Sequence, residues 1–165
     1  MNLGRVLRHL ISPPWMVGRA FSPSTMQAIE RAIKESEAGH QGEIRFAVEA
    51  ALEITPLLKN QPAGERAVEV FSQLRVWDTE HNNGVLIYLL LADRDVEIVA
   101  DRGIHQHVKK EGWEKICREM EALFRQGRFE EGAITGIKAV SLHLAKHYPG
   151  QGQNTNELPD TPVIL

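Results

Sequence analysis

One apolar run constrains the fold of this chain more than any other segment. Residues 84–91 read GVLIYLLL, and the polar turn Ala92-Asp93-Arg94-Asp95 separates them from a second apolar run, residues 96–100. A strand that is apolar on both faces is covered on both faces in a folded protein. Because the turn reverses the chain, we expect residues 85–91 and 96–101 to form an antiparallel hairpin around which the fold is organised.

The remaining segments show strand or helical periodicity. Residues 43–49 alternate polar and apolar side chains, which predicts a strand with one buried face. Residues 54–64 contain two prolines and a glycine, which predicts a loop. Apolar residues at helical spacing, a capping Ser24 and a break at Gly127 predict the helices. We expect these helices at residues 24–38, 67–77, 113–124 and 134–148.

The order of these elements predicts the architecture. A strand–helix–strand unit makes its two strands parallel with a right-handed crossover, and the hairpin adds an antiparallel strand. We therefore predict an α/β fold, a three-layer α/β/α sandwich around a small mixed β-sheet that contains one β-hairpin. A chain of 165 residues normally forms one domain. We assign this domain to residues 22–148, with a basic N-terminal arm at 1–21 and an extended or disordered tail at 149–165.

Composition excludes several classes of protein. A formal net charge of -3 gives no basic surplus for nucleic acid. The single cysteine, Cys117, cannot form an internal disulfide, and we expect it in the core with Trp77 and Trp113. The apolar run is far shorter than the roughly 20 residues of a membrane-spanning helix. We therefore expect a cytoplasmic protein that neither binds nucleic acid nor spans a membrane.

The N-terminal arm allows two interpretations. Residues 1–21 hold Arg5, Arg8, His9 and Arg19 but no acidic residue. They form either a short amphipathic helix packed on the domain or a basic arm that contacts an anionic surface. In the second case membrane binding is weak, because stable anchoring takes two signals.

Three motifs resemble those of one known family. Asn83-Gly84-Val85-Leu86 matches the last four positions of that family's Asp-Asn-Gly-Val-Leu motif. The turn at Asp93-Arg94 followed by Val96-Glu97-Ile98 resembles its hairpin, and residues 124–132, FRQGRFEEG, resemble its helix junction. The motifs occur in the family's order within residues 24–148. The chain thus resembles the TPM domain family, in its soluble bacterial subgroup.

This resemblance implies a fold and a range of functions. The family fold is an α/β/α sandwich. Some members are acid phosphatases, some bind a divalent cation, often calcium, and others act in assembly or interaction. Two positions depart from the family pattern, because Asn82 stands where the family has an acid and Asp101-Arg102-Gly103 replaces the usual Gly-Tyr-Gly.

The hairpin brings polar residues together at one end of the predicted sheet. If the turn pivots between Asp93 and Arg94, Asp101 lies opposite Leu86 and near residues 78–84. Carboxylate and amide oxygens are the ligands of hard cations. We therefore predict a site for calcium or another divalent cation at Asp78, Glu80, Asn82 and Asp101, with Arg102 and His105 as anion or substrate contacts. The alternative is that these residues only cap the loop and form a surface charge network.

Other candidate residues are weaker. His143 and His147 have a helical spacing that binds transition metals, but a solvated helix face explains them better. Arg125 and Arg128 either hold an anion or offset the dipole at a helix C-terminus. The sequence contains no nucleophile elbow and no phosphate-binding loop motif. We therefore predict a binding or assembly module with a protein partner, in solution or at a membrane. The alternative is a metal-assisted acid phosphatase acting on phosphomonoesters.

Overall fold

The computed structural model describes residues 2–152 and 154–165 and shows helices around a four-stranded sheet. The helices are α1 (Leu3–Leu10), α2 (Trp15–Ala20), α3 (Pro23–Glu37), α4 (Ile54–Leu58), α5 (Ala63–Gln73), α6 (Arg102–Arg125) and α7 (Phe129–His147). The strands are β1 (Glu43–Glu49), β2 (Gly84–Leu90), β3 (Asp95–Ala100) and β4 (Val163–Ile164).

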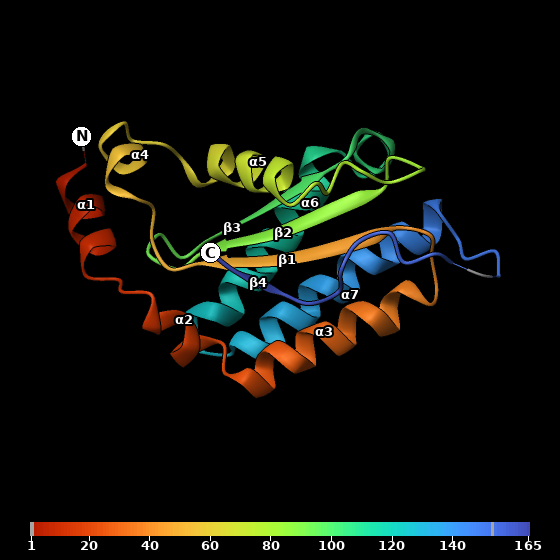
Figure 1. Cartoon of the computed structure of the whole chain (residues 1–165), viewed down its shortest axis with the longest axis horizontal. Helices are drawn as coiled ribbons and strands as arrows, with labels where there is room; N and C mark the ends of the chain where they lie inside the picture. The colour runs from red at the N-terminus through yellow and green to blue at the C-terminus, as the bar shows by residue number, and fades with distance from the viewer. Residues whose placement is uncertain (1, 153) are drawn as a thin grey trace.

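The elements form three layers, which confirms the predicted α/β/α sandwich. The strand order is β3-β2-β1-β4, with β1 parallel to both β2 and β4, and β2 antiparallel to β3. Helices α3, α6 and α7 bury one face of the sheet, and α4 and α5 bury the other (Figure 1). Each face has its own apolar cluster, so the sheet separates two cores.

The hairpin forms as predicted, but its register differs by two residues. Every residue of β2 is buried. Val85 pairs with Ala100, and the N–H of Asp101 donates to the Gly84 carbonyl at 2.9 Å, so Asp101 does not lie opposite Leu86. The reason is that the turn is centred between Ala92 and Asp93, one residue earlier than expected, with the N–H of Arg94 donating to the Leu91 carbonyl at 3.0 Å.

The prediction that β1 has one buried face is wrong. All seven of its residues are buried, because the strand lies between β2 and β4 and both faces of the sheet are covered. Its charged side chains therefore need internal partners. Glu49 accepts a hydrogen bond from the Tyr88 hydroxyl at 2.6 Å and forms an ion pair with Arg66 at 3.0 Å. Burial and this carboxylate together raise the pKa of Tyr88.

Several helix boundaries differ from the sequence-based expectation: α5 runs from Ala63 to Gln73 rather than over residues 67–77, α6 begins at Arg102 rather than at residue 113, and α7 begins at Phe129 rather than at residue 134. Ser22, not Ser24, caps α3, since Pro23 occupies the first helical position and Ser22 Oγ accepts the N–H of Thr25. The segment predicted as a loop contains the short helix α4.

The tryptophans behave differently from one another. Trp113 and Cys117 are buried in the core, as predicted. Trp77 is 48% exposed, because α5 ends at Gln73 and the following turn carries Trp77 outward, where the Arg75 guanidinium lies over its ring.

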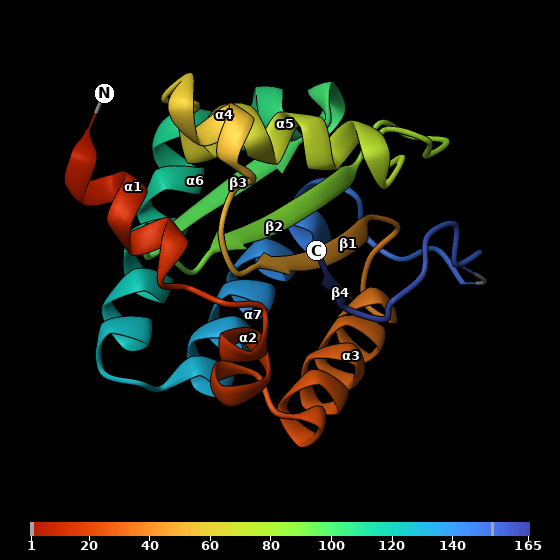
Figure 2. The ribbon, with the colours of Figure 1, turned by 60° about the vertical axis from the view of Figure 1, so that its left-hand side comes forward.

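The two terminal segments are tied to the domain. The arm runs along its outside, with α1 at the end of the sheet where the β2–β3 turn lies (Figure 2). Val17 and Phe21 are buried in the core. The C-terminal strap, residues 154–165, runs beside β1 and adds β4 to the edge of the sheet. Among the described residues, none of the helices has the length and apolar character that crossing a bilayer requires.

Candidate functional site

The polar end of the sheet is where β1 and β2 begin and β3 ends, on the right in Figure 1. We use this name for residues 37–43, 78–84, 101–105 and the start of the strap, residues 154–158. Hydrogen bonds join these segments, for example from the N–H of Ile104 to the Asn82 carbonyl and from Asn154 Nδ2 to the His40 carbonyl. Segments far apart in the sequence therefore meet here.

Small residues allow this close approach. A Cβ atom on Gly84 would lie 2.0 Å from the Val76 carbonyl oxygen, and one on Gly103 would lie 2.4 Å from the Asn82 carbonyl oxygen. Any side chain at either position would push the loop away from β2 or α6. Because Gly84 has no side chain, the start of β2 can lie against the backbone of Val76 in the turn after α5.

Two buried oxygens at the polar end lack a hydrogen-bond partner among the described residues. Asp101 caps α6, and its Oδ1 accepts the N–H of Arg102 at 2.7 Å, but its Oδ2 has no partner. Asn83 is fully buried; its Nδ2 donates to the Gln41 carbonyl at 3.0 Å, and its Oδ1 has no partner. Buried polar atoms are nearly always hydrogen-bonded, so these two oxygens are exceptions that need an explanation.

The structure brings only some of the predicted site residues together. Asn82 and Asp101 flank the same backbone junction, with Asn82 in the left-handed region at φ 51°. Asp78 is exposed and pairs with Arg75 at 3.2 Å, and the carboxylate of Glu80 is exposed. Within residues 2–152 and 154–165, no three His, Cys, Asp or Glu side chains lie close enough to hold a metal ion. The cation site therefore stays a prediction.

The expected substrate contacts lie on the first turns of α6. Arg102 and His105 are both exposed there, beside the cap residue Asp101. The structure also shows an arrangement that the sequence did not indicate, since the rings of His107 and His147 stack at 4.4 Å.

Two buried carboxylates at the polar end were missed by sequence reasoning. Glu37 Oε1 accepts the N–H of Ile44 at 2.9 Å, and burial, reinforced by the charge of Glu43, raises the pKa of Glu37 to about 9. Glu43 accepts the N–H groups of Glu157 and Leu158 at 3.2 and 3.1 Å, and burial raises its pKa to about 7. Strand alternation assigned Glu43 to solvent, whereas Glu37 follows Ile29 and Ile33 at i,i+4 spacing, a local signal that could have placed it on the buried face of α3.

A polar pocket of about 350 Å³ opens at this end. Its lining joins the predicted loop to the strap: Gln41, Glu80, His81, Asn154, Thr155 and Glu157. The carboxylates give it negative charge, and the amides add hydrogen-bonding groups. Chemically, such a lining suits a cation or a polar group better than an apolar ligand.

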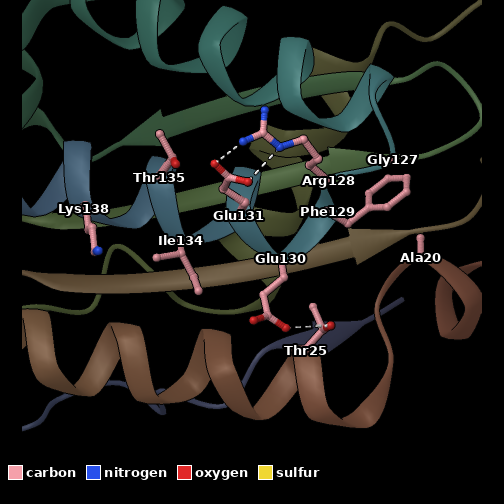
Figure 3. A pocket seen from close by; sticks show the side chains of 10 residues that line it. All are labelled: Ala20, Thr25, Gly127, Arg128, Phe129, Glu130, Glu131, Ile134, Thr135 and Lys138. Atoms are coloured by element: carbon pink, nitrogen blue, oxygen red, sulfur yellow. Dashed lines mark hydrogen bonds and ion pairs between the residues drawn. The ribbon is translucent and has the colours of Figure 1, made fainter.

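A second hollow lies between α3 and the start of α7 (Figure 3). Its arginine is already engaged, because the Arg128 guanidinium binds the carboxylate of Glu131. Thr25 likewise donates to Glu130 at 3.0 Å. Arg125 pairs with Glu121 at 3.3 Å, so Arg125 and Arg128 each already have a carboxylate partner. The polar end is therefore the better candidate.

Comparison with known proteins agrees with this geometry. The family profile described as TPM domain matches residues 18–142. The chain belongs to the TPM domain family. The solution structure of the BA42 protein from the psychrophilic bacterium Bizionia argentinensis is 32% identical, with a TM-score of 0.77, and the match covers 88% of this chain and 95% of that chain.

A more distant structure shares the fold of this TPM domain. It is the N-terminal domain of a protein from P. gingivalis, 18% identical, with a TM-score of 0.62, covering 85% of this chain and 94% of that chain. No curated protein matches the chain. The similarity therefore establishes family and fold.

The family motifs of the TPM domain occupy defined places in the fold. Asn83-Gly84-Val85-Leu86 leads from the polar end into β2. The α6–α7 junction packs closely, since a Cβ on Gly132 would lie 2.5 Å from the Phe124 ring and one on Gly136 would lie 2.2 Å from the Met120 sulfur. One motif therefore shapes the candidate site, and another shapes the core.

Proposed function

We propose that this TPM domain is a binding or assembly module that takes a divalent cation, calcium for example, at its polar end. The observation that carries the proposal is the pair of buried oxygens, Asp101 Oδ2 and Asn83 Oδ1, that lack partners among the described residues. A buried acceptor without a hydrogen bond costs about 1–3 kcal/mol, which a bound cation would recover. Oxygen atoms of this kind are the ligands that calcium prefers.

Asp101 and Asn83 would form the inner part of such a site. Asp78 and Glu80 lie exposed on the adjacent loop and are the carboxylates that would complete an oxygen shell. Asn83 takes the place that we first gave to Asn82, because its side chain is buried at the junction. A protein partner would then contact the exposed surface near the site. A cytoplasmic location also remains part of the proposal.

A calcium titration followed by NMR amide shifts tests the proposal. We expect shifts confined to residues 78–84 and 101–107. Asp101→Ser should abolish them, because serine keeps the helix cap but removes the carboxylate. Glu119→Gln is the matched control, since it removes an exposed carboxylate on α6 away from this end. Shifts that persist in Asp101→Ser, or that do not occur in the parent protein, would reject the cation site.

The alternative is a metal-assisted acid phosphatase acting on phosphomonoesters. The observation in its favour is that Arg102 and His105 lie exposed beside Asp101 at the start of α6, where helix N-termini attract phosphate. A cation bound there would polarise a phosphoryl oxygen. Hydrolysis of p-nitrophenyl phosphate at acid pH with calcium, magnesium or manganese tests it. Activity that Arg102→Gln or Asp101→Ser leaves intact would exclude this site.

A further inference from the structure

Helix α1 turns its apolar face away from the protein. The exposed apolar residues are between 59% and 72% accessible and continue into the start of α2: Leu3, Leu7, Leu10, Ile11 and Trp15. In a helix with 3.6 residues per turn, the first four of these side chains fall within one narrow face. A short amphipathic helix packed on a domain normally buries this face, and here the arrangement is reversed.

Polar contacts fix this reversed orientation. Arg5 binds Asp93 in the hairpin turn at 2.7 Å, and His9 Nε2 lies 3.0 Å from the same carboxylate. His9 is 4% exposed, and its Nδ1 accepts the N–H of Leu52 at 3.0 Å. Because Arg5 and His9 occupy the side of α1 opposite to Leu7, the helix cannot turn its leucines inward without breaking these contacts.

Further apolar and basic groups surround this face. Ile54 and Leu58 of the neighbouring helix α4 are 63% and 54% exposed. Arg8, on the border of the α1 face, and Arg94, in the hairpin turn, are exposed. Beside α2, a cavity of about 300 Å³ has a mainly apolar lining that includes Met16, Leu89, Leu91 and Phe124; its charged members are Arg94, Arg125 and Glu121, and Glu121 pairs with Arg125.

We propose that the apolar face of α1 and the start of α2 dock on the surface of an anionic lipid bilayer. Charge complementarity selects this occupant, because the exposed Arg8 and Arg94 lie beside the apolar face and residues 2–21 contain no acidic residue. Exposed leucines enter the acyl boundary, Trp15 lies at the headgroup level, and Arg8 and Arg94 contact anionic headgroups. A helix of eight residues lies in the interface and does not cross it.

This binding surface is distinct from the polar end, so it does not depend on the proposed cation site. The helix is held by Asp93, at the opposite end of the sheet from Asp101. Docking through α1 would leave the polar end facing the solution. The bilayer would thus concentrate the domain at a membrane while its candidate site stays accessible.

Vesicle flotation with the full chain tests the proposal. We expect the protein to float with vesicles of mixed phosphatidylcholine and phosphatidylglycerol, and to float less at high salt, where screening weakens contacts with headgroups. The double variant Leu7→Glu with Leu10→Glu should weaken binding at least about tenfold, because two apolar side chains no longer enter the lipid. Neither leucine is buried, so the variant should fold normally.

Leu142→Glu is the matched control, since Leu142 is 74% exposed on α7, outside the docking face. It should bind vesicles as the parent protein does. A blue shift of tryptophan fluorescence on vesicle addition, lost in Trp15→Phe, would place the arm in the interface. Equal weakening by Leu142→Glu, or no flotation of the parent protein, overturns the proposal. A concentration-dependent dimer that Leu7→Glu with Leu10→Glu disperses, without vesicle binding, assigns the face to self-association and also overturns it.

Discussion

At the hairpin end of the sheet Asp93 is surrounded by Arg5, Arg8 and His9, whereas at the polar end Glu37, Glu43 and Asp101 form no ion pair among the described residues. The pKa values follow this difference. Burial alone would raise the pKa of Asp93, but Arg5 and His9 outweigh it and hold that pKa below its usual range. At the polar end burial instead raises the pKa of Glu37 to about 9 and the pKa of Glu43 to about 7.

The carboxylate of Asp93 is used in ion pairs that hold the fold, whereas the polar end still has a carboxylate oxygen able to accept a ligand. The Asp93 carboxylate holds the N-terminal arm in place through its ion pair with Arg5. At the polar end backbone N–H groups hold the carboxyl groups, and Asp101 Oδ2 keeps an acceptor without a partner in the described part of the chain. Perturbed acids gathered at one place are a common mark of functional sites.

The largest effect should come from Asp93→Ala. It would leave the Arg5 guanidinium, only 12% exposed, without its counter-charge, and His9 Nε2, whose side chain is 1% exposed, without its carboxylate neighbour. Removing one partner of a largely buried pair destabilises a protein by about 4 kcal/mol. Urea unfolding followed by circular dichroism measures this loss. Asp78→Ala, which breaks an exposed pair at the polar end, is the control, and an equal loss in both variants would remove the contrast.

The pH dependence of stability should come next in size. Because the folded protein holds Glu43 protonated up to about pH 7, stability should fall as the pH rises from 4.5 through 7. Glu43→Gln should lose about 3 kcal/mol less than the parent protein over this interval. Asp93 acts in the opposite sense, since its contribution is lost as the pH falls through its lowered pKa. Unfolding curves that are parallel for both proteins would contradict the shift.

Packing at the polar end should give a smaller effect. Gly103→Ala would place a Cβ atom 2.4 Å from a backbone oxygen and 2.6 Å from the Tyr148 hydroxyl, and relieving such a clash costs about 2 kcal/mol. Gly18→Ala in α2 is the control, because nothing lies within 4 Å of its added methyl group. Thermal unfolding should show a loss for Gly103→Ala and none for Gly18→Ala. Similar melting temperatures for both variants would mean that the backbone around Gly103 shifts to accept a methyl group at little cost, against the prediction.

The smallest effect should come from Arg8→Ala. Its side chain is 55% exposed and reaches Asp93 only at 3.5 Å, a distance at which surface ion pairs contribute below about 0.5 kcal/mol. Urea unfolding should therefore barely distinguish this variant from the parent protein. A loss close to that of Asp93→Ala would mean that Arg8, rather than Arg5 and His9, carries the hairpin-end cluster.

The sequence predicted the sandwich and the position of the polar end because both depend on strong local patterns. The apolar run of β2 demanded cover on both faces, and the hairpin had to return Asp101 toward the loop that precedes Gly84. The register was missed because the turn is centred one residue before the Asp93-Arg94 pair, with Arg94 in the left-handed region at φ 54°, and the residue types of the turn allow either centre. The buried state of Glu43 was missed because its partners belong to the strap, more than 100 residues away.

The strap is in effect a ligand that the chain carries for its own sheet. Among the described residues, Ala47 and Val48 of β1 pair with β4, and nearer the start of β1 the side chains of Glu43 and Arg45 hold the strap against the strand. A tethered segment of this kind has an effective concentration on the order of millimolar at its site. A foreign strand that pairs with this edge must therefore outcompete the strap, which makes the strap a barrier to edge-to-edge aggregation.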